Sequence, residues 1–253
     1  MGNQKEKAGN QIVFEKRKEL DYRTNEAYKS LRTNIQFCGA DVKVMAFTSC
    51  TPNEGKSSVC FNLSTSFAQD GKKVIMIDAD MRKSVLVGRY KVGAVEGGLS
   101  HYLSGQKTLQ EVVMHTDIDG FDIIFSGPFA PNPSELVGSE RMTELLSQLR
   151  EEYDYVIIDT PPLGSVIDAA VISQLTDGVV LVIENNAISY RFAQSVKRQL
   201  EQVDCKLLGA VLNKVPMGKK GYYGRYYGKY YGKYYGKYYG TYGQNEEEET
   251  QEE

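Results

Sequence analysis

A short loop between an apolar run and a helical pattern narrows the choice of fold more than any other segment. It reads Thr48-Ser49-Cys50-Thr51-Pro52-Asn53-Glu54-Gly55-Lys56-Ser57-Ser58. A Gly-Lys-Ser sequence in this context binds phosphate, because backbone N–H groups and the helix N-terminus face the anion. Lys56 is expected at the β- and γ-phosphates and Ser57 at Mg²⁺. The residues predicted to bind the nucleotide are Thr51, Pro52, Asn53, Glu54, Gly55, Lys56, Ser57 and Ser58.

Short apolar runs alternate with helical patterns along the rest of the chain. The runs expected as strands are Val44–Thr48, Val74–Ile77, Asp122–Phe125, Tyr155–Ile158, Val179–Ile183 and Leu207–Leu212. Several are continuously apolar, as parallel strands are when both faces are covered. Apolar residues recur every four positions at Val59, Leu63 and Phe67, and again at Ile188, Phe192, Val196 and Leu200, which indicates helices. The alternation predicts a three-layer α/β domain with right-handed crossovers.

Two further helices are predicted from local patterns. Around residues 24–37, Ala27, Leu31 and Ile35 share one face. A set of charges lies on an adjacent face and has the plain reading of a solvated surface: Glu26, Lys29 and Arg32. A second helix should begin near Asn132, with Pro133 at its first position and Glu135 completing a capping box. We expect one domain over residues 1–216, including the helix at about 24–37, and a tail over 217–253.

Three aspartates follow two of the predicted strands. Asp78 and Asp80 come after Val74–Ile77, and Asp159 comes after Tyr155–Ile158. Ligands of open α/β sheets bind at the carboxyl ends of the strands. One of Asp78 and Asp80 could position Mg²⁺ and the other accept a hydroxyl proton, whereas a polar strand end with a helix cap is the poorer explanation beside a phosphate loop. Asp159 matches a metal-supporting carboxylate.

The C-terminal segment repeats Tyr-Tyr-Gly-Lys/Arg and ends in a run of glutamates. A glycine in every unit lowers helix stability by about 1 kcal/mol each, so a flexible tail is expected. Taken alone, such a tail favours a segment that stacks on single-stranded nucleic acid or self-associates, but next to an ATP site a set of phosphorylation sites is the better interpretation. The tyrosines are Tyr222, Tyr223, Tyr226, Tyr227, Tyr230, Tyr231, Tyr234, Tyr235, Tyr238, Tyr239 and Tyr242.

Composition excludes several classes of protein. The four cysteines lack metal-ligand spacing and there are only two histidines, so neither a zinc site nor a disulfide framework is expected. No apolar run approaches the roughly 20 residues that span a bilayer, and the polar start has no signal-peptide core. The net charge of -3 gives no case for nucleic-acid binding. These features favour a soluble cytoplasmic protein, for which any role at the membrane would need a partner.

At these motifs the chain resembles the bacterial tyrosine kinases of capsule and exopolysaccharide systems, in the form with a separate cytoplasmic kinase subunit. The resemblance rests on the phosphate loop, the tyrosine-rich tail, Asp78-Ala79-Asp80-Met81-Arg82-Lys83 and Pro131-Asn132-Pro133-Ser134-Glu135-Leu136. Ser84 stands where proline is common. The resemblance implies a doubly wound, mostly parallel sheet of the P-loop NTPase type, and ATP-dependent autophosphorylation of the tail with Mg²⁺.

The resemblance also implies roles for individual residues. Lys56, Asp78, Asp80 and Asp159 would serve catalysis, and the metal ligands would be Ser57, Asp78 and Asp159. Asn213 would contact adenine, although an asparagine that ends a strand is nearly as good an explanation. Glu26, Lys29 and Arg32 would form the helix through which the family assembles a ring, with each tail reaching a neighbour's site. Lys29 replaces an arginine there and loses its bidentate fork.

The resemblance implies two kinds of partner besides other copies of the chain. One is a transmembrane adaptor of the polysaccharide chain-length type that activates the kinase, and the other is a phosphotyrosine phosphatase. The function implied is control of polysaccharide synthesis or export at the inner face of the membrane. No nucleic-acid partner is expected.

The main alternative is a P-loop ATPase that partitions chromosomes or places division sites. Those enzymes share the fold, and their phosphate loop also departs from the usual pattern. In this chain the departure is Cys50, which stands where the usual pattern has its first glycine. Those ATPases carry a characteristic lysine near the loop's start, where this chain has Thr51, and their membrane-bound forms end in a basic amphipathic helix rather than Tyr-Tyr-Gly repeats. Both differences favour the kinase.

Overall fold

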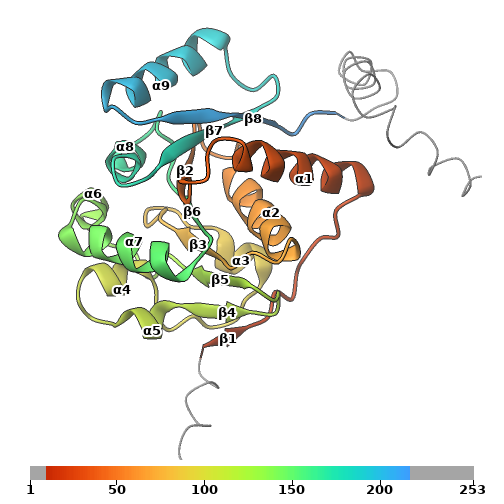
Figure 1. Cartoon of the computed structure of the whole chain (residues 1–253). Coiled ribbons are helices and arrows are strands. Elements are labelled where there is room, and N and C mark those ends of the chain that lie inside the picture. The colour runs from red at the N-terminus through yellow and green to blue at the C-terminus, as the bar shows by residue number, and fades with distance from the viewer. Residues whose placement is uncertain (1–9, 217–253) are drawn as a thin grey trace, which may run out of the picture. The chain divides into compact units, whose positions relative to one another are not determined.

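The computed structural model describes residues 10–216, so the eleven tail tyrosines and the segment predicted as a tail lie outside the described residues. Within 10–216 the strands form one eight-stranded sheet in the order β1-β4-β5-β3-β6-β2-β7-β8 (Figure 1). The strands are β1 Gln11–Ile12, β2 Val44–Ser49, β3 Val74–Asp78, β4 Met114–Thr116, β5 Phe121–Ile124, β6 Tyr155–Asp159, β7 Gly178–Glu184 and β8 Leu207–Asn213. Each of the six predicted strands is confirmed.

All neighbouring strands are parallel except β4 and β5, which pair antiparallel. The sequence did not predict β1 or β4. Each is only two or three residues long, too short for alternation or an apolar run to be recognised. The mostly parallel, doubly wound sheet is confirmed.

Nine helices connect the strands in the described part of the chain. They are α1 Tyr22–Gln36, α2 Lys56–Gln69, α3 Leu86–Tyr90, α4 Leu99–Leu103, α5 Leu109–Val112, α6 Pro133–Val137, α7 Glu140–Glu152, α8 Asp168–Ser173 and α9 Tyr190–Gln202. The helix predicted near residues 24–37 is α1, and it begins two residues earlier because the Asp21 carboxylate accepts a hydrogen bond from the Thr24 N–H at 3.1 Å.

The capping box predicted at Asn132 is wrong in its geometry. α6 does begin after Asn132, with Pro133 in its first turn, but the Asn132 side chain accepts no cap hydrogen bond. Its amide instead donates to the Glu135 carboxylate at 2.7 Å. The two side chains that should satisfy backbone N–H groups therefore satisfy each other.

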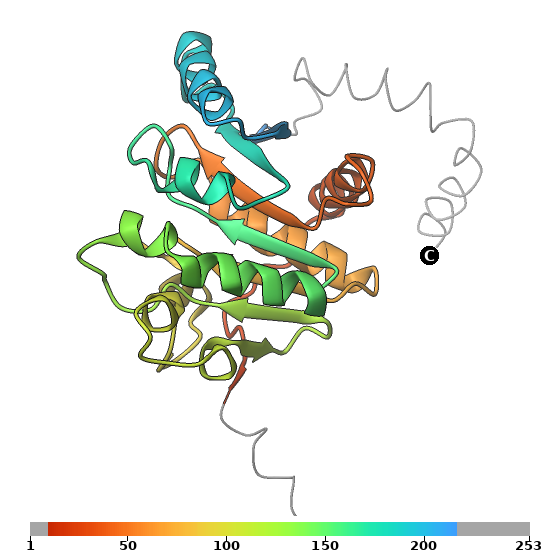
Figure 2. The same ribbon diagram turned by 60° about the vertical axis from the view of Figure 1, so that its left-hand side comes forward.

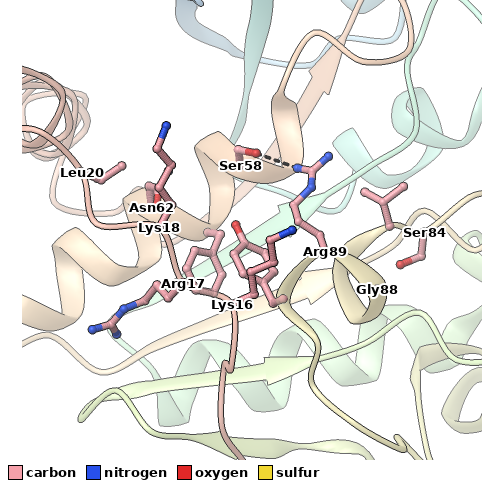
Figure 3. Close-up of a pocket in the computed structure, with 12 residues that line it drawn as sticks. Lys16, Arg17, Lys18, Leu20, Ser58, Asn62, Ser84, Gly88 and Arg89 are labelled. Carbon is pink, nitrogen blue, oxygen red and sulfur yellow. Dashed lines mark hydrogen bonds between the residues drawn. The ribbon is translucent and has the colours of Figure 1, made fainter.

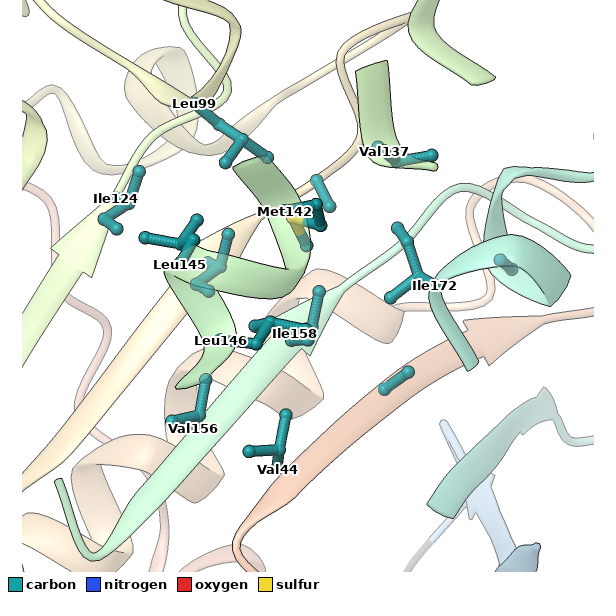
Figure 4. Close-up of a cluster of buried hydrophobic side chains, with 14 of the residues drawn as sticks. Val44, Leu99, Ile124, Val137, Met142, Leu145, Leu146, Val156, Ile158 and Ile172 are labelled. Atoms are coloured by element: carbon teal, nitrogen blue, oxygen red, sulfur yellow. The ribbon is translucent and has the colours of Figure 1, made fainter. Parts of the chain in front are cut away.

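Alternate residues of the central strands face two separate cores, one on each side of the sheet. On one side Val44 of β2 and Ile158 of β6 pack against α7 and α8, in the cluster shown in Figure 4. On the other side Met45 of β2 and Ile157 of β6 pack against α2. Figure 2, turned from Figure 1, shows the helices on either side of the sheet. This confirms the predicted three layers and explains the continuously apolar strands.

Candidate active site

The predicted site residues meet at the carboxyl ends of β2, β6 and β3, which are neighbours in the centre of the sheet. β2 leads into the phosphate loop, β6 ends at Asp159 and β3 ends at Asp78. Asp78 and Asp159 are register partners on adjacent strands. Strand order therefore brings together two carboxylates that lie 81 positions apart in the sequence, with the phosphate loop on the next strand.

Backbone conformation at the end of the phosphate loop explains its glycine. Gly55 has a φ of 89°, in the left-handed region that glycine adopts without steric cost. The chain then turns directly into α2, whose first residues are Lys56, Ser57 and Ser58. The first N–H groups of a helix have no intrahelical acceptor, so this turn offers donors and a positive dipole to an anion.

Glu54 holds the phosphate loop in shape from the inside. Its side chain is buried, and one carboxylate oxygen accepts hydrogen bonds from the N–H groups of Cys50 (2.7 Å) and Thr51 (2.8 Å). The other oxygen accepts a longer bond from the Glu184 N–H on β7. The sequence predicts Glu54 among the nucleotide-binding residues, and that role stays a prediction.

Lys56 and Asp159 form an ion pair in which both side chains are buried. Burial opposes the charge on Lys56, but the adjacent Asp159 carboxylate outweighs it and raises the pKa of the lysine. The Cys60 thiol lies 3.7 Å from the same carboxylate, and burial together with that negative charge raises its pKa well above the usual value. Cys60 is therefore an uncharged wall of the site rather than a nucleophile.

Asp78 and Asp80 occupy different environments although they are two residues apart. Asp78 is buried, and burial together with the Asp159 charge raises its pKa to about 7. The Ser84 hydroxyl donates a hydrogen bond to the Asp78 carboxylate and favours its charged form. Asp80 is half-buried and accepts a hydrogen bond from the Lys83 N–H at 3.0 Å. Of the two carboxylates, Asp80 is the more accessible from solvent.

The loop after β6 packs directly on the phosphate loop. The Thr48 hydroxyl donates to the Pro161 carbonyl at 3.0 Å, and the Leu163 N–H donates to the Ser49 carbonyl at 2.9 Å. At Gly164 there is no space for a side chain, because a Cβ would lie 2.1 Å from the Cys50 carbonyl oxygen. These contacts fix the spacing between the phosphate loop and Asp159. Sequence reasoning did not single out Thr48 or Gly164 for this role.

Arg82, in the segment after β3, forms hydrogen bonds to side chains of two helices, α6 and α8. Its guanidinium binds the buried Asp168 carboxylate in a bidentate pair, at 2.8 and 3.0 Å. Ser134 on α6 donates to the same carboxylate at 2.6 Å and accepts from Arg82 at 2.9 Å. Burial opposes the charge of Asp168, but these hydrogen bonds prevail and lower its pKa. The sequence motifs contained Arg82 and Ser134 but gave no signal for Asp168.

Asn213 ends β8 beside the phosphate loop. Its side-chain amide donates to the Glu54 carbonyl at 2.9 Å. The predicted contact of Asn213 with adenine stays a prediction.

The three charges predicted at an oligomer interface divide into two groups on α1. Lys29 and Glu26 pair with each other at 2.7 Å, and both side chains are roughly half exposed. Arg32 turns toward α2, where it donates to the Ser66 carbonyl at 2.6 Å and pairs with Asp70 at 3.1 Å. Arg32 thus fastens α1 to α2 within one chain. The interface role of all three residues stays a prediction.

The donors gathered at this edge of the sheet suit Mg²⁺ bound together with a nucleotide. Among residues 10–216 there is no cluster of three or more His, Cys, Asp or Glu side chains able to hold a metal alone. Two aspartates and the Ser57 hydroxyl would offer oxygen ligands, which Mg²⁺ prefers, and Mg²⁺ commonly completes its shell with phosphate oxygens and water. The donor set therefore fits a metal that arrives with its phosphates.

Known proteins match this chain over most of its length. The family described as "AAA domain" matches residues 42–210. The tyrosine-protein kinase CpsD of Streptococcus agalactiae is 39% identical over 80% of this chain and 91% of its own. The kinase domain of the Escherichia coli tyrosine kinase ETK is 36% identical, with a TM-score of 0.73 over 78% of each chain. The chimerical protein CapA2B2 is 36% identical, with a TM-score of 0.72 over 76% of this chain and 84% of its own.

Proteins of the division-site class share the fold at a greater distance. MinD of Pyrococcus horikoshii, solved with Mg-ADP, is 21% identical, with a TM-score of 0.60 over 70% of this chain and 72% of its own. That likeness supports the architecture alone. Within residues 10–216, no helix combines the length and apolar character needed to cross a bilayer.

Proposed function

This chain belongs to the AAA-domain family and, within it, to the bacterial tyrosine-protein kinases, and we propose that it phosphorylates the tyrosines of its own C-terminal repeat. The observation that carries the proposal is one edge of the sheet. There a phosphate loop, a buried Lys56–Asp159 pair and the Asp78 carboxylate meet. The same chain supplies eleven candidate acceptor tyrosines between residues 222 and 242.

Each residue of the site has its own role in the proposed phosphoryl transfer, and its position supports that role. The N–H groups around Gly55 and the Lys56 ammonium bind the triphosphate of ATP. Ser57, Asp78 and Asp159 hold Mg²⁺, which neutralises phosphate charge when bound. Asp80, the more exposed carboxylate, orients the acceptor hydroxyl and takes its proton. A free tyrosine has a pKa near ~10, so transfer at neutral pH needs such a base.

We further propose that phosphorylation occurs between copies of the chain in a ring. The exposed Lys29–Glu26 pair on α1 supports this because it could exchange its partners for those of a neighbour. Each phosphate adds roughly -1.5 to -2 charge. The basic repeat would become strongly acidic, and the carboxylates of the site would repel it, which would loosen the ring.

The proposed setting is the cytoplasmic face of the membrane, in capsule or exopolysaccharide synthesis. A transmembrane adaptor would recruit and activate the chain, and a phosphotyrosine phosphatase would reset it. The family membership supports this setting, and the paired name of the chimera CapA2B2 supports a partner chain.

Mass spectrometry after incubation with Mg·ATP tests the activity. Wild type should gain phosphate on residues 222–242, and Lys56→Met should gain none. Hydrolysis of ATP without tyrosine modification would contradict the proposal and favour a division-site type of ATPase. Light scattering on wild type and Glu26→Ala tests the ring separately, because a monomeric wild type at micromolar concentration would count against it.

A further inference from the structure

A basic pocket lies next to the candidate active site, and its cationic residues have no part in the function proposed above. Its volume is about 1040 Å³, and its cationic lining residues are Lys16, Arg17, Lys18 and Arg89. Figure 3 shows these side chains projecting from two segments, the stretch before α1 and the helix α3. Glu15 and Glu19 flank the first segment in the sequence, but no acidic residue lines the pocket.

The pocket adjoins the site on two sides. Ser58 in the first turn of α2 is one lining residue, and Arg89 donates to its hydroxyl at 2.6 Å. Ser58 follows Lys56 by two residues, which is about 3 Å along a helix. Ser84 is a second lining residue, and its hydroxyl binds Asp78. A ligand held in the pocket is therefore within reach of both the phosphate loop and the candidate carboxylates.

Two of the residues that line the pocket, Phe61 and Tyr90, are aromatic and pack against each other. Phe61 and Tyr90 stack with ring centroids 4.1 Å apart, and Phe14 packs edge-on against Phe61 at 4.8 Å. The Lys16 N–H donates to the Tyr90 carbonyl at 3.2 Å, which fastens the first basic segment to the end of α3.

The four cations lack acidic partners within the described residues. All four side chains belong to exposed residues, and none of the ion pairs formed between residues 10 and 216 includes them. Four unpaired cations around one cavity attract a polyanion and bring it in faster than diffusion alone. The charge of the pocket therefore suits a ligand with several negative charges.

The chain itself contains a matching polyanion. Residues 246–253 read Glu-Glu-Glu-Glu-Thr-Gln-Glu-Glu, six carboxylates without a cation. Glu246 follows Tyr242 by four residues, so at most about 14 Å of extended chain separates them. An acidic end bound in the pocket would keep the last tyrosines of the repeat beside the candidate site.

We propose that the basic pocket binds the acidic C-terminal segment, residues 246–253, of the copy whose tyrosines are being phosphorylated. This inference rests on the proposed function and adds a docking site to it. The acidic segment binds through charge to the copy whose active site transfers the phosphate. The tyrosine repeat that precedes the segment then enters that active site. The tyrosines nearest the anchor, Tyr238, Tyr239 and Tyr242, are modified first.

A two-chain assay separates docking from chemistry. The acceptor is the full chain carrying Lys56→Met. The donor is the full chain with its eleven tail tyrosines changed to phenylalanine and residues 246–249, 252 and 253 changed to glutamine, so that it neither accepts phosphate nor fills its own pocket. Phosphate on the acceptor is followed by mass spectrometry while acceptor concentration is varied. Lys16→Gln/Lys18→Gln in the donor, and glutamine at 246–249, 252 and 253 in the acceptor, are compared singly and together.

Each change should raise the KM for the acceptor roughly threefold to tenfold at low salt, as several exposed ion pairs allow. The KM for ATP should stay unchanged, and both changes together should cost no more than one. The neutral acceptor should also lose its preference for Tyr238, Tyr239 and Tyr242. Arg198→Gln/Lys206→Gln, which removes two exposed cations on and after α9, is the matched control and should have no effect.

Three results would overturn the docking site. One is an unchanged KM for the neutral acceptor. The second is a rise in the KM for ATP in the pocket variant, which would assign the pocket to the nucleotide. The third is a pocket variant whose KM rises as much for the neutral acceptor as for the acidic one, each compared with the donor that has an unchanged pocket. That result would assign the pocket to another anion such as a lipid surface. Absence of phosphotyrosine with the unchanged donor and acceptor would instead contradict the proposed function.

Discussion

Lys56 and Asp159 are joined by an ion pair that neither residue shares with solvent, since their side chains are 7% and 1% exposed. The pair spans the gap between the first turn of α2 and the end of β6. Asp78 lies beside it as the register partner of Asp159. The single lysine pairs with Asp159, whereas burial and the Asp159 charge raise the pKa of the neighbouring Asp78 to about 7.

The Lys56–Asp159 pair should dominate the stability of the site. Lys56→Met leaves Asp159 buried without a cation, and loss of one partner of a buried pair costs about 3–5 kcal/mol. We expect a fall of this size in the free energy of unfolding measured with urea in nucleotide-free protein. Lys56→Met/Asp159→Asn should recover most of it, because the uncompensated charge is then gone. Simple additivity of the two single changes would show that the pair is not coupled.

Glu54 should be needed for the shape of the phosphate loop rather than for contact with ATP. Glu54→Ala removes the acceptor of the buried Cys50 N–H and of the half-buried Thr51 N–H, and a buried donor left without a partner costs about 1–3 kcal/mol. We expect lower stability in urea and a KM for ATP about tenfold higher, equivalent to about 1.4 kcal/mol of binding. Glu54→Gln keeps an oxygen that can accept both bonds and is the control. Equal effects of alanine and glutamine would show that the charge, and not the pair of bonds, matters.

The pair of Arg82 and Asp168 should make stability depend on acid pH. The pKa of Asp168 is lower in the folded chain than its unfolded value near ~3.9. Its contribution is therefore present above about pH 4 and is lost as the pH falls through the lower folded pKa. Asp168→Asn should lower the free energy of unfolding by about 1–3 kcal/mol at pH 7.

The difference between wild type and Asp168→Asn should be constant from pH 5 to 8 and shrink below about pH 4. Urea unfolding at each pH measures it. Ser134→Ala removes one of the hydrogen bonds to Asp168 and should give a smaller loss with the same pH dependence. A difference that grows on acidification would contradict the assignment.

Much of this architecture follows from local sequence patterns. Continuously apolar runs predict β2, β6 and β7 because strands covered on both faces need no polar residues. The carboxyl ends of β2, β3 and β6 then place the phosphate loop, Asp78 and Asp159 together, since parallel strands all end at one edge. The antiparallel β4 was missed because three residues carry no periodic signal.

Side-chain contacts away from the carboxyl ends of the strands could not be predicted from the sequence. The Arg82–Asp168 pair joins residues 86 positions apart, and nothing in the local pattern marks Asp168. The basic pocket likewise combines residues 16–18 with Arg89. Arg32 has the spacing of a surface charge, yet packing of α1 on α2 turns it toward Asp70. Predictions for the tail tyrosines stay predictions, because those residues lie outside 10–216.

Ser84 should tune the metal site through Asp78. Its hydroxyl donates a hydrogen bond to the Asp78 carboxylate. Partners of metal ligands typically change metal affinity about 10- to 100-fold when they are removed. We expect Ser84→Ala to raise the Mg²⁺ concentration for half-maximal tyrosine phosphorylation about tenfold.

Two controls separate this effect from general damage at Ser84. Ser84→Thr keeps the hydroxyl and should behave as wild type. Since residue 84 is exposed, the free energy of unfolding of Ser84→Ala should stay within about 0.5 kcal/mol of wild type. The rate is measured by mass spectrometry over a Mg²⁺ series at fixed ATP. Coinciding Mg²⁺ curves for Ser84→Ala and wild type would mean that this hydrogen bond does not affect metal binding. They would contradict the proposed role of Asp78 as a Mg²⁺ ligand.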